Sequence, residues 1–131
     1  MIGIDTSVII DILRKHTDWE KVRQSSDEDF WTSELVVYEL FYGAYASKEL
    51  TEKKIKDIEA LLDVFTFIAP FQRKAAIEAA RIGGTLSKEG QMIDHIDLLI
   101  AGSLLANGCT TFLTKNKRDF ERIKELHVVS L

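Results

Sequence analysis

Cysteine and proline are almost absent from this chain of 131 residues, which holds one of each. A single cysteine, Cys109, excludes an intramolecular disulfide and any zinc site built from several thiolates. With seven glycines and a hydrophobic share of 46%, the composition is that of a globular protein rather than of a disordered or collagen-like chain. At this length we expect a single domain over residues 1–131.

The chain also lacks a long apolar run. Its longest uncharged and mostly apolar stretch, residues 98–107, is about half as long as a membrane-spanning helix. The first acid, Asp5, comes within five residues of the start, and no basic segment followed by an apolar one precedes it. These features predict a cytoplasmic protein with no membrane partner.

An excess of basic residues, the usual mark of a nucleic-acid-binding surface, is missing as well. Lys and Arg number 17 and Asp and Glu number 21, which gives a net charge of −4. Net charge misleads, however, when several acids gather in one pocket and a metal ion neutralises them. Setting aside four such acids leaves 17 residues of each sign, so the position of the acids matters more than their number.

Short apolar runs alternate with segments of helical periodicity along the whole chain. Strands are expected in five short β-rich or apolar runs: 1–5, 29–32, 64–69, 110–114 and 127–131. Helices are expected in the segments between them: 7–13, 19–24, 33–45, 51–63, 72–87, 94–106 and 119–126. This alternation predicts a doubly wound α/β fold, with a mostly parallel sheet of four to five strands flanked by helices.

Four acidic residues stand near predicted strand ends or helix starts: Asp5, Glu39, Asp97 and Asp119. Ligands of a parallel sheet gather at the carboxyl ends of its strands. Asp5 lies at such an end, where a role as an N-cap or turn residue is one explanation for it. Thr6 and Ser7 are equally able to cap the helix that follows, which leaves Asp5 free for other work.

Glu39 and Asp97 carry the stronger signal. The helix neighbours of Glu39 three and four positions away are uncharged, so Glu39 needs a cation from elsewhere or an edge position that reaches water. Asp97 is the only charged residue from 96 to 106, but with Asp94 as the helix cap it falls in the first turn, where the helix dipole alone also accounts for a carboxylate. Asp119 by itself is explained as the cap of the helix over 119–126.

Carboxylates gathered in one place raise one another's pKa unless a divalent cation offsets their charge. A site of oxygen ligands, without a His or Cys cluster, suits Mg²⁺ or Mn²⁺ better than zinc. Such ions activate water for attack on a phosphodiester. The four acids together therefore predict a metal-dependent enzyme that acts on phosphate esters.

Four segments in order resemble a PIN domain, and most closely the VapC-type toxins of prokaryotic toxin–antitoxin pairs. They are residues 4–11 (IDTSVIID), 33–43 (SELVVYELFYG), 97–101 (DLLIA) and 113–120 (LTKNKRDF). The resemblance spans the full chain. It implies a PIN-like fold and a Mg²⁺- or Mn²⁺-dependent endoribonuclease acting on RNA, whose catalytic and metal-holding quartet is Asp5, Glu39, Asp97 and Asp119.

The resemblance also implies supporting roles. Asp5 and Asp97 would hold the metal most directly, and the residues that support the acids or a water on the metal would be Ser7, Thr114 and Asn116. The extra acid Asp94 leaves the membership of the metal shell open. The implied partners are a cognate VapB-type antitoxin, whose C-terminal segment docks on the toxin and blocks the site, and a second copy of the chain in a homodimer.

RNA needs a positive path to such a site. Five basic residues flank the predicted site elements: Arg14, Lys15, Lys115, Lys117 and Arg118. Solvated surface positions explain them equally well, because lysines are usually exposed.

Other functions stay open on sequence grounds. A haloacid-dehalogenase-like phosphatase needs a second Asp two residues after the first, where this chain has Ser7. A phospho-receiver needs an acid after its third strand, where this chain has Ala69 and Pro70. A non-catalytic PIN-like module that binds RNA or protein is the remaining alternative, and the presence of all four acids argues against it.

Overall fold

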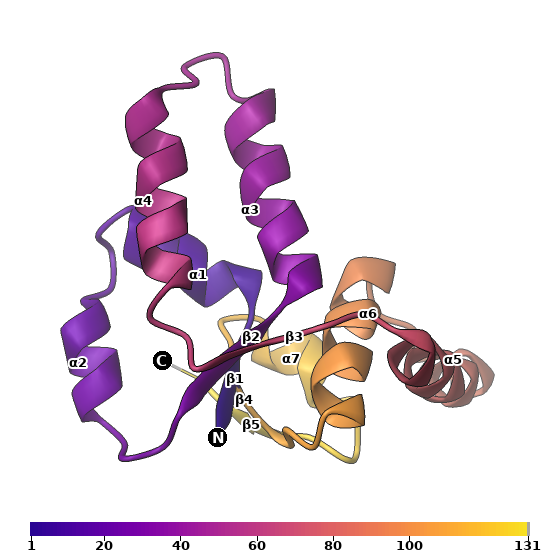
Figure 1. Ribbon diagram of the computed structural model, residues 1–131. Coiled ribbons are helices and arrows are strands. Elements are labelled where there is room, and N and C mark those ends of the chain that lie inside the picture. The colour runs from indigo at the N-terminus through magenta and orange to yellow at the C-terminus, as the bar shows by residue number, and fades with distance from the viewer. Residues whose placement is uncertain (131) are drawn as a thin grey trace.

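Strands and helices alternate as the sequence predicts in the computed structural model, which describes residues 1–130 (Figure 1). The strands are β1 (Ile2–Ile4), β2 (Phe30–Ser33), β3 (Phe67–Ala69), β4 (Thr111–Leu113) and β5 (His127–Val129). The helices are α1 (Thr6–Leu13), α2 (Trp19–Gln24), α3 (Glu34–Ala46), α4 (Glu52–Leu62), α5 (Arg73–Lys88), α6 (His95–Ala106) and α7 (Lys117–Phe120).

All five strands pair in parallel in one sheet of order β3-β2-β1-β4-β5. The central strand β1 pairs through Gly3 with Trp31 on one side and Phe112 on the other. Ile4 and Phe112 are fully buried, as expected for strands covered on both faces. The predicted doubly wound fold is thus confirmed.

The order of the strands creates a topological switch point beside β1. The chain steps outward from β1 to β2 and β3, and then crosses to β4 and β5 on the other side of β1. In open parallel sheets, ligands bind in the crevice outside the carboxyl ends of the two strands at such a switch. Here Asp5 directly follows β1 and Thr114 directly follows β4.

Two helix pairs stand out in Figure 1. Helices α3 and α4 rise side by side above the sheet, while α5 and α6 lie against each other on the right. The second pair packs closely because small residues meet at its contact: a Cβ built on Gly102 of α6 would lie 2.7 Å from the Cβ of Ala79 and 3.0 Å from the carbonyl oxygen of Ala75 in α5. Within residues 1–130, no helix has the length and apolar character needed to cross a bilayer.

Two predicted elements differ from the observed ones. The strand expected over 64–69 is confined to β3, because the amides of Val64 and Phe65 bond back to Leu61 and Leu62 and continue the turn after α4. The helix expected over 119–126 is wrong: α7 covers Lys117–Phe120, and tight turns follow that bring Ile123 into the core. The end of the last predicted strand, residue 131, lies outside the described residues.

Candidate active site

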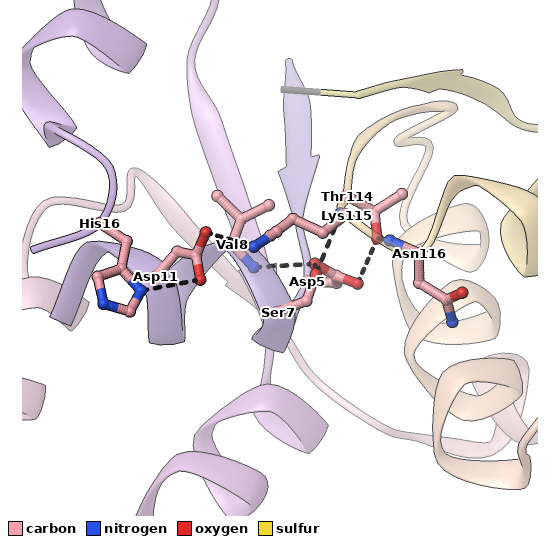
Figure 2. Close-up of polar contacts among 8 residues, drawn as sticks. All are labelled: Asp5, Ser7, Val8, Asp11, His16, Thr114, Lys115 and Asn116. Atoms are coloured by element: carbon pink, nitrogen blue, oxygen red, sulfur yellow. Dashed lines mark hydrogen bonds and ion pairs between the residues drawn. The ribbon is translucent and has the colours of Figure 1, made fainter. Parts of the chain in front are cut away.

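Asp5 occupies the switch point and is almost fully buried, with 3% of its surface exposed. Ser7 donates a hydrogen bond from Oγ to Asp5 Oδ1 at 2.7 Å, and Thr114 donates from Oγ1 to Oδ2 at 2.6 Å (Figure 2). The backbone amide of Val8 also lies 3.4 Å from Oδ1. Both carboxylate oxygens of Asp5 are therefore held by neighbours from β4's end and from α1.

The expectation that Thr6 or Ser7 caps the first helix is wrong. Asp5 itself is the N-cap of α1, with extended backbone angles and its side chain accepting from Val8. Thr6 and Ser7 lie inside the helix, and their hydroxyls are committed elsewhere, to Glu39 and to Asp5. Asp5 thus combines a capping role with a place in the acidic site.

Burial sets the ionisation of Asp5. Removal from water raises its pKa above the ordinary 3.8, and the hydrogen bonds from Thr114, Ser7 and the Val8 amide oppose that rise. Burial therefore makes the charged form of Asp5 unfavourable, while these hydrogen-bond donors stabilise it. A buried carboxylate with this many donors is fixed in orientation.

Glu39 comes to the site from the first half of α3. Its Oε1 accepts a hydrogen bond from Thr6 Oγ1 at 2.6 Å, which ties α3 to the first turn of α1 beside Asp5. Glu39 is only partly buried, so the second sequence-based alternative, an edge position that reaches water, is the observed one. Within residues 1–130, no Lys, Arg or His forms an ion pair with Asp5, Glu39 or Asp97.

Asp97 lies in the first turn of α6, behind the predicted cap Asp94, which accepts from the Ile96 amide at 2.9 Å. The pKa of Asp97 is raised from 3.8 to about 6, chiefly because the side chain is half-buried. The negative charges of its acidic neighbours add to this rise, and they are Asp5, Asp94, Glu39 and Asp119. The four predicted site acids thus share one electrostatic neighbourhood with Asp94.

Asn116 links the two remaining acids. Its Nδ2 donates to Asp97 Oδ2 at 3.3 Å and to Asp119 Oδ2 at 3.1 Å. Asp119 does not cap a helix, contrary to expectation; it lies inside the short helix α7, with Asn116 at the cap position. Arg122 approaches Asp119 Oδ1 to 4.0 Å, which is the one ion pair that the quartet makes in the described chain.

The predicted basic residues differ in their surroundings. Lys115 is paired with Asp11 at 2.7 Å and Lys117 with Glu121 at 3.5 Å. Arg14 and Glu39 both line a groove of about 380 Å³ between α1, α3 and α4. All five basic residues are exposed, and their role in binding RNA stays a prediction.

Three contacts at this edge escaped sequence reasoning. These are the bond from Thr6 to Glu39, the ion pair between Lys115 and Asp11, and a buried bond of 2.7 Å from Ser103 Oγ to Ser33 Oγ that joins α6 to the cap of α3. No local sequence pattern predicts these contacts, because each joins residues more than 30 positions apart.

The donor set suits a hard divalent cation. It consists of carboxylate oxygens with a raised pKa at Asp97 and almost no compensating cation, which is the situation a bound Mg²⁺ or Mn²⁺ relieves. Within residues 1–130, no three acidic, His or Cys side chains already stand close enough together to hold an ion.

Comparisons with known proteins agree with this geometry. The family model described as PIN domain matches residues 2–126. Over 122 residues the chain is 31% identical to Ribonuclease VapC2 of Haemophilus influenzae, covering 92% of this chain and 89% of that protein.

Solved structures give the same result. One chain of VapBC2 from Rickettsia felis, crystallised with a DNA fragment from their promoter, matches with a TM-score of 0.88 and 26% identity, covering 100% of this chain and 99% of that one. A chain of VapBC-1 from nontypeable Haemophilus influenzae matches with a TM-score of 0.83 and 27% identity, over 99% and 98% of the two chains. The resemblance seen in the four sequence segments is confirmed. This chain belongs to the PIN domain family, among the VapC ribonucleases.

Proposed function

We propose that this protein is a divalent-metal-dependent endoribonuclease and the toxin of a type II toxin–antitoxin pair. The observation that carries the proposal is the gathering of Asp5, Glu39, Asp97 and Asp119 around the switch point, where no Lys or Arg of the described residues forms an ion pair with the first three. Holding these negative charges close together does not stabilise the fold, because each charge raises the free energy of the others. The arrangement is useful in a site that binds a cation, because the cation offsets their repulsion.

Asp5 and Asp97 are the residues we assign to hold the metal directly, with Glu39 and Asp119 completing the set. When bound, Mg²⁺ or Mn²⁺ supplies activation of water and stabilisation of charge on the phosphate. Ser7 and Thr114 keep both oxygens of Asp5 in place. Asn116 sets the distance between Asp97 and Asp119 through one amide group. Short side chains with few rotamers thus pre-orient the acids.

RNA is the substrate that follows from this assignment. The exposed cations on both sides of the acids are suited to the phosphate backbone, and they are Arg14, Lys15, Lys115, Lys117 and Arg118. Single-stranded or looped RNA is the expected form, because its phosphates reach into the crevice without a partner strand in the way.

The partner we propose is an antitoxin of VapB type. The solved relatives from Rickettsia felis and Haemophilus influenzae are VapBC complexes. The groove between α1, α3 and α4 offers a peptide apolar contacts with Ile10, Leu13 and Leu40, and Glu39 is part of its lining, so we expect a segment lying in it to block the site. The exposed tyrosines of α3, at 38, 42 and 45, are where we expect antitoxin or a second copy of the chain to pack.

Substitution of Asp97 by Asn tests the enzyme. Removal of a group that only hydrogen-bonds to a metal ligand costs about 10- to 100-fold, so loss of a direct ligand should lower cleavage of a single-stranded RNA by about 100-fold or more. Wild type should cleave with Mg²⁺ or Mn²⁺ and stop when a chelator is added. Asp27→Asn, an exposed acid in a loop, is the matched control and should leave cleavage unchanged.

Metal binding has a readout that does not depend on cleavage. Titration of Mn²⁺ followed by calorimetry should give binding to wild type and to Asp27→Asn, a raised melting temperature for both, and neither effect in Asp97→Asn. Asp94→Asn keeps the helix cap and removes one charge, so it reports whether Asp94 joins the shell. Full cleavage in excess chelator, or by Asp97→Asn, is the result that would refute the assignment.

A further inference from the structure

Lys115 contacts helix α1 at two points, one turn apart. Its backbone N–H donates to Ser7 Oγ at 3.1 Å, and its Nζ lies 2.7 Å from Asp11 Oδ2. Ser7 and Asp11 are four positions apart in α1 and so share one face of the helix. Figure 2 shows both contacts: Lys115 lies alongside α1, with Ser7 and Asp5 toward one end of the helix and Asp11 toward the other.

The segment fastened in this way is the one that touches most of the proposed acids. Thr114 donates to Asp5, and its hydroxyl in turn accepts from the Asn116 amide at 2.9 Å. The side chain of Asn116 reaches Asp97 and Asp119. A displacement of residues 114–116 therefore disturbs three of the four acids at once.

The Asp11 side chain is well placed to hold this segment. Only 15% of it is exposed, against 50% of Lys115, so one end of the ion pair is fixed in the helix and shielded from water. The backbone carbonyl oxygen of Asp11 accepts hydrogen bonds from the backbone amides of His16 and Thr17. These bonds hold the end of α1, where Lys15 has a positive φ of 61°. The other titratable group that faces Asp11 in the described chain is His16, whose Nδ1 lies 3.9 Å from Oδ1.

We infer that Asp11 and Lys115 form a clamp that positions residues 114–116 against α1, and that both are positioning residues for the proposed ribonuclease. Neither needs to touch RNA for this role. The inference rests on the proposed function for its kinetic consequences, but the clamp itself is a property of the fold. It also gives Lys115 a different task from the phosphate contact that its charge and exposure suggest.

Steady-state kinetics distinguish the two tasks. If the pair is a clamp, Asp11→Asn and Lys115→Met should each lower kcat by about fivefold, the upper end expected for one partly exposed ion pair, with KM changed by less than about twofold. The double variant should lose no more than either single one, because the two residues act through one contact. Lys115→Arg should restore most of the rate, since Arg also pairs with a carboxylate.

The phosphate alternative predicts the opposite pattern. Lys115→Met would then raise KM, while Asp11→Asn would free the lysine and lower KM or leave it unchanged. That divergence overturns the clamp. Glu20→Gln, which breaks an exposed pair of 2.8 Å with Arg23 on α2, is the matched control and should change neither constant.

Amide hydrogen exchange measures the clamp without any RNA or metal. In Asp11→Asn and Lys115→Met, the amides of Lys115 and Asn116 should exchange about fivefold faster, while that of Phe112 within β4 keeps its wild-type rate. Unchanged exchange at Lys115 and Asn116 overturns the inference even if activity falls. If instead wild type shows no metal-dependent cleavage, the proposed function fails while faster exchange still establishes the clamp.

Discussion

Asp5 and Asp97 lie in one site, but two regions of the molecule hold them by different means. Asp5 sits at the edge of β1 and β4, where hydrogen bonds from Ser7 and Thr114 fix both of its oxygens. Asp97 lies on α6, and close packing of small residues against α5 fixes the position of this helix. Directional polar contacts position the first acid, and steric contacts between backbones position the second.

This difference extends to the charges. The donors that orient Asp5 also stabilise its carboxylate, although it is nearly inaccessible to water. The packing that positions Asp97 does nothing for its charge, and Asn116 is its one donor within residues 1–130. The pKa of about 6 comes chiefly from partial burial of the Asp97 side chain, and the negative charges of the acids around it add to the rise. Hydrogen-bond donors therefore offset part of the cost of burying the Asp5 carboxylate, whereas Asp97 at the amino end of α6 has a single donor among the described residues.

The packed region should be the less tolerant of added volume. In Gly102→Ala, the new methyl group would lie 2.7 Å from the Ala79 Cβ and 3.0 Å from the Ala75 carbonyl oxygen, so α6 must move away from α5. We expect the free energy of unfolding to fall by about 3 kcal/mol, as for other over-packed cores. Cleavage should fall too, because Asp97 moves with its helix. Urea denaturation and a cleavage assay measure the two effects.

Gly84→Ala is the matched control on α5. No atom lies within 4 Å of a Cβ built there, so the substitution adds helix propensity without a clash. The expected result is a gain of about 0.5–1 kcal/mol in the free energy of unfolding and no change in cleavage. A similar loss of stability in both variants would mean that the α5–α6 contact is looser than its geometry indicates.

Sequence reasoning succeeds where the cause is local. Asp94 is the cap of α6 as predicted, and the alternation of strands and helices is read from short apolar runs. Because a parallel sheet brings its strand ends to one edge, the nearness of acids from four separate segments also followed from the order of elements. That these acids bind a metal and catalyse cleavage stays a prediction.

What escaped prediction depends on which side chains face each other across the switch point. Thr6 or Ser7 was expected to cap α1, but Asp5 is the cap. The Thr6 hydroxyl donates its hydrogen bond to Glu39 on α3 instead. The pair of Lys115 and Asp11 joins residues 104 positions apart. The end of α7 was misplaced because burial of Ile123 outweighs local helix propensity. Tertiary contacts select the partner in each case, and no short window of sequence contains both members.

The polar edge should respond to loss of a donor rather than to added volume. Thr114→Val keeps the shape of the side chain but removes the hydrogen bond to Asp5 Oδ2. A hydrogen bond to a buried charge is worth about 2 kcal/mol, which is the expected loss of unfolding free energy at pH 8. Because that bond lowers the Asp5 pKa, its loss raises the pKa further, and the loss of stability should shrink as pH falls and Asp5 takes up a proton.

Thr111→Val on the same strand provides the comparison. Within residues 1–130 the Thr111 hydroxyl makes no hydrogen bond, so this substitution should change stability by less than about 0.5 kcal/mol at any pH. Parallel denaturation curves for the two variants at low and neutral pH give the result. A loss in Thr114→Val that does not vary with pH would show that Asp5 is not the group being stabilised.

The smallest effect is expected from the charge of Asp97 on the stability of the metal-free protein. Its pKa of about 6, against an ordinary 3.8, means that the folded state binds this proton more tightly than the unfolded chain does. Stability from this residue is therefore full in acid and is lost as pH rises from about 4 to about 7, by about 1 kcal/mol once solvent screening is allowed for. Asp97→Asn should abolish that decline and be the more stable protein at pH 7.5 in chelator.

An identical decline of stability with pH in the variant would assign the decline to another group. If the variant is both more stable and inactive, the Asp97 carboxylate lowers the stability of the metal-free protein but is needed for cleavage. This is expected of a residue whose negative charge is offset only when a cation binds.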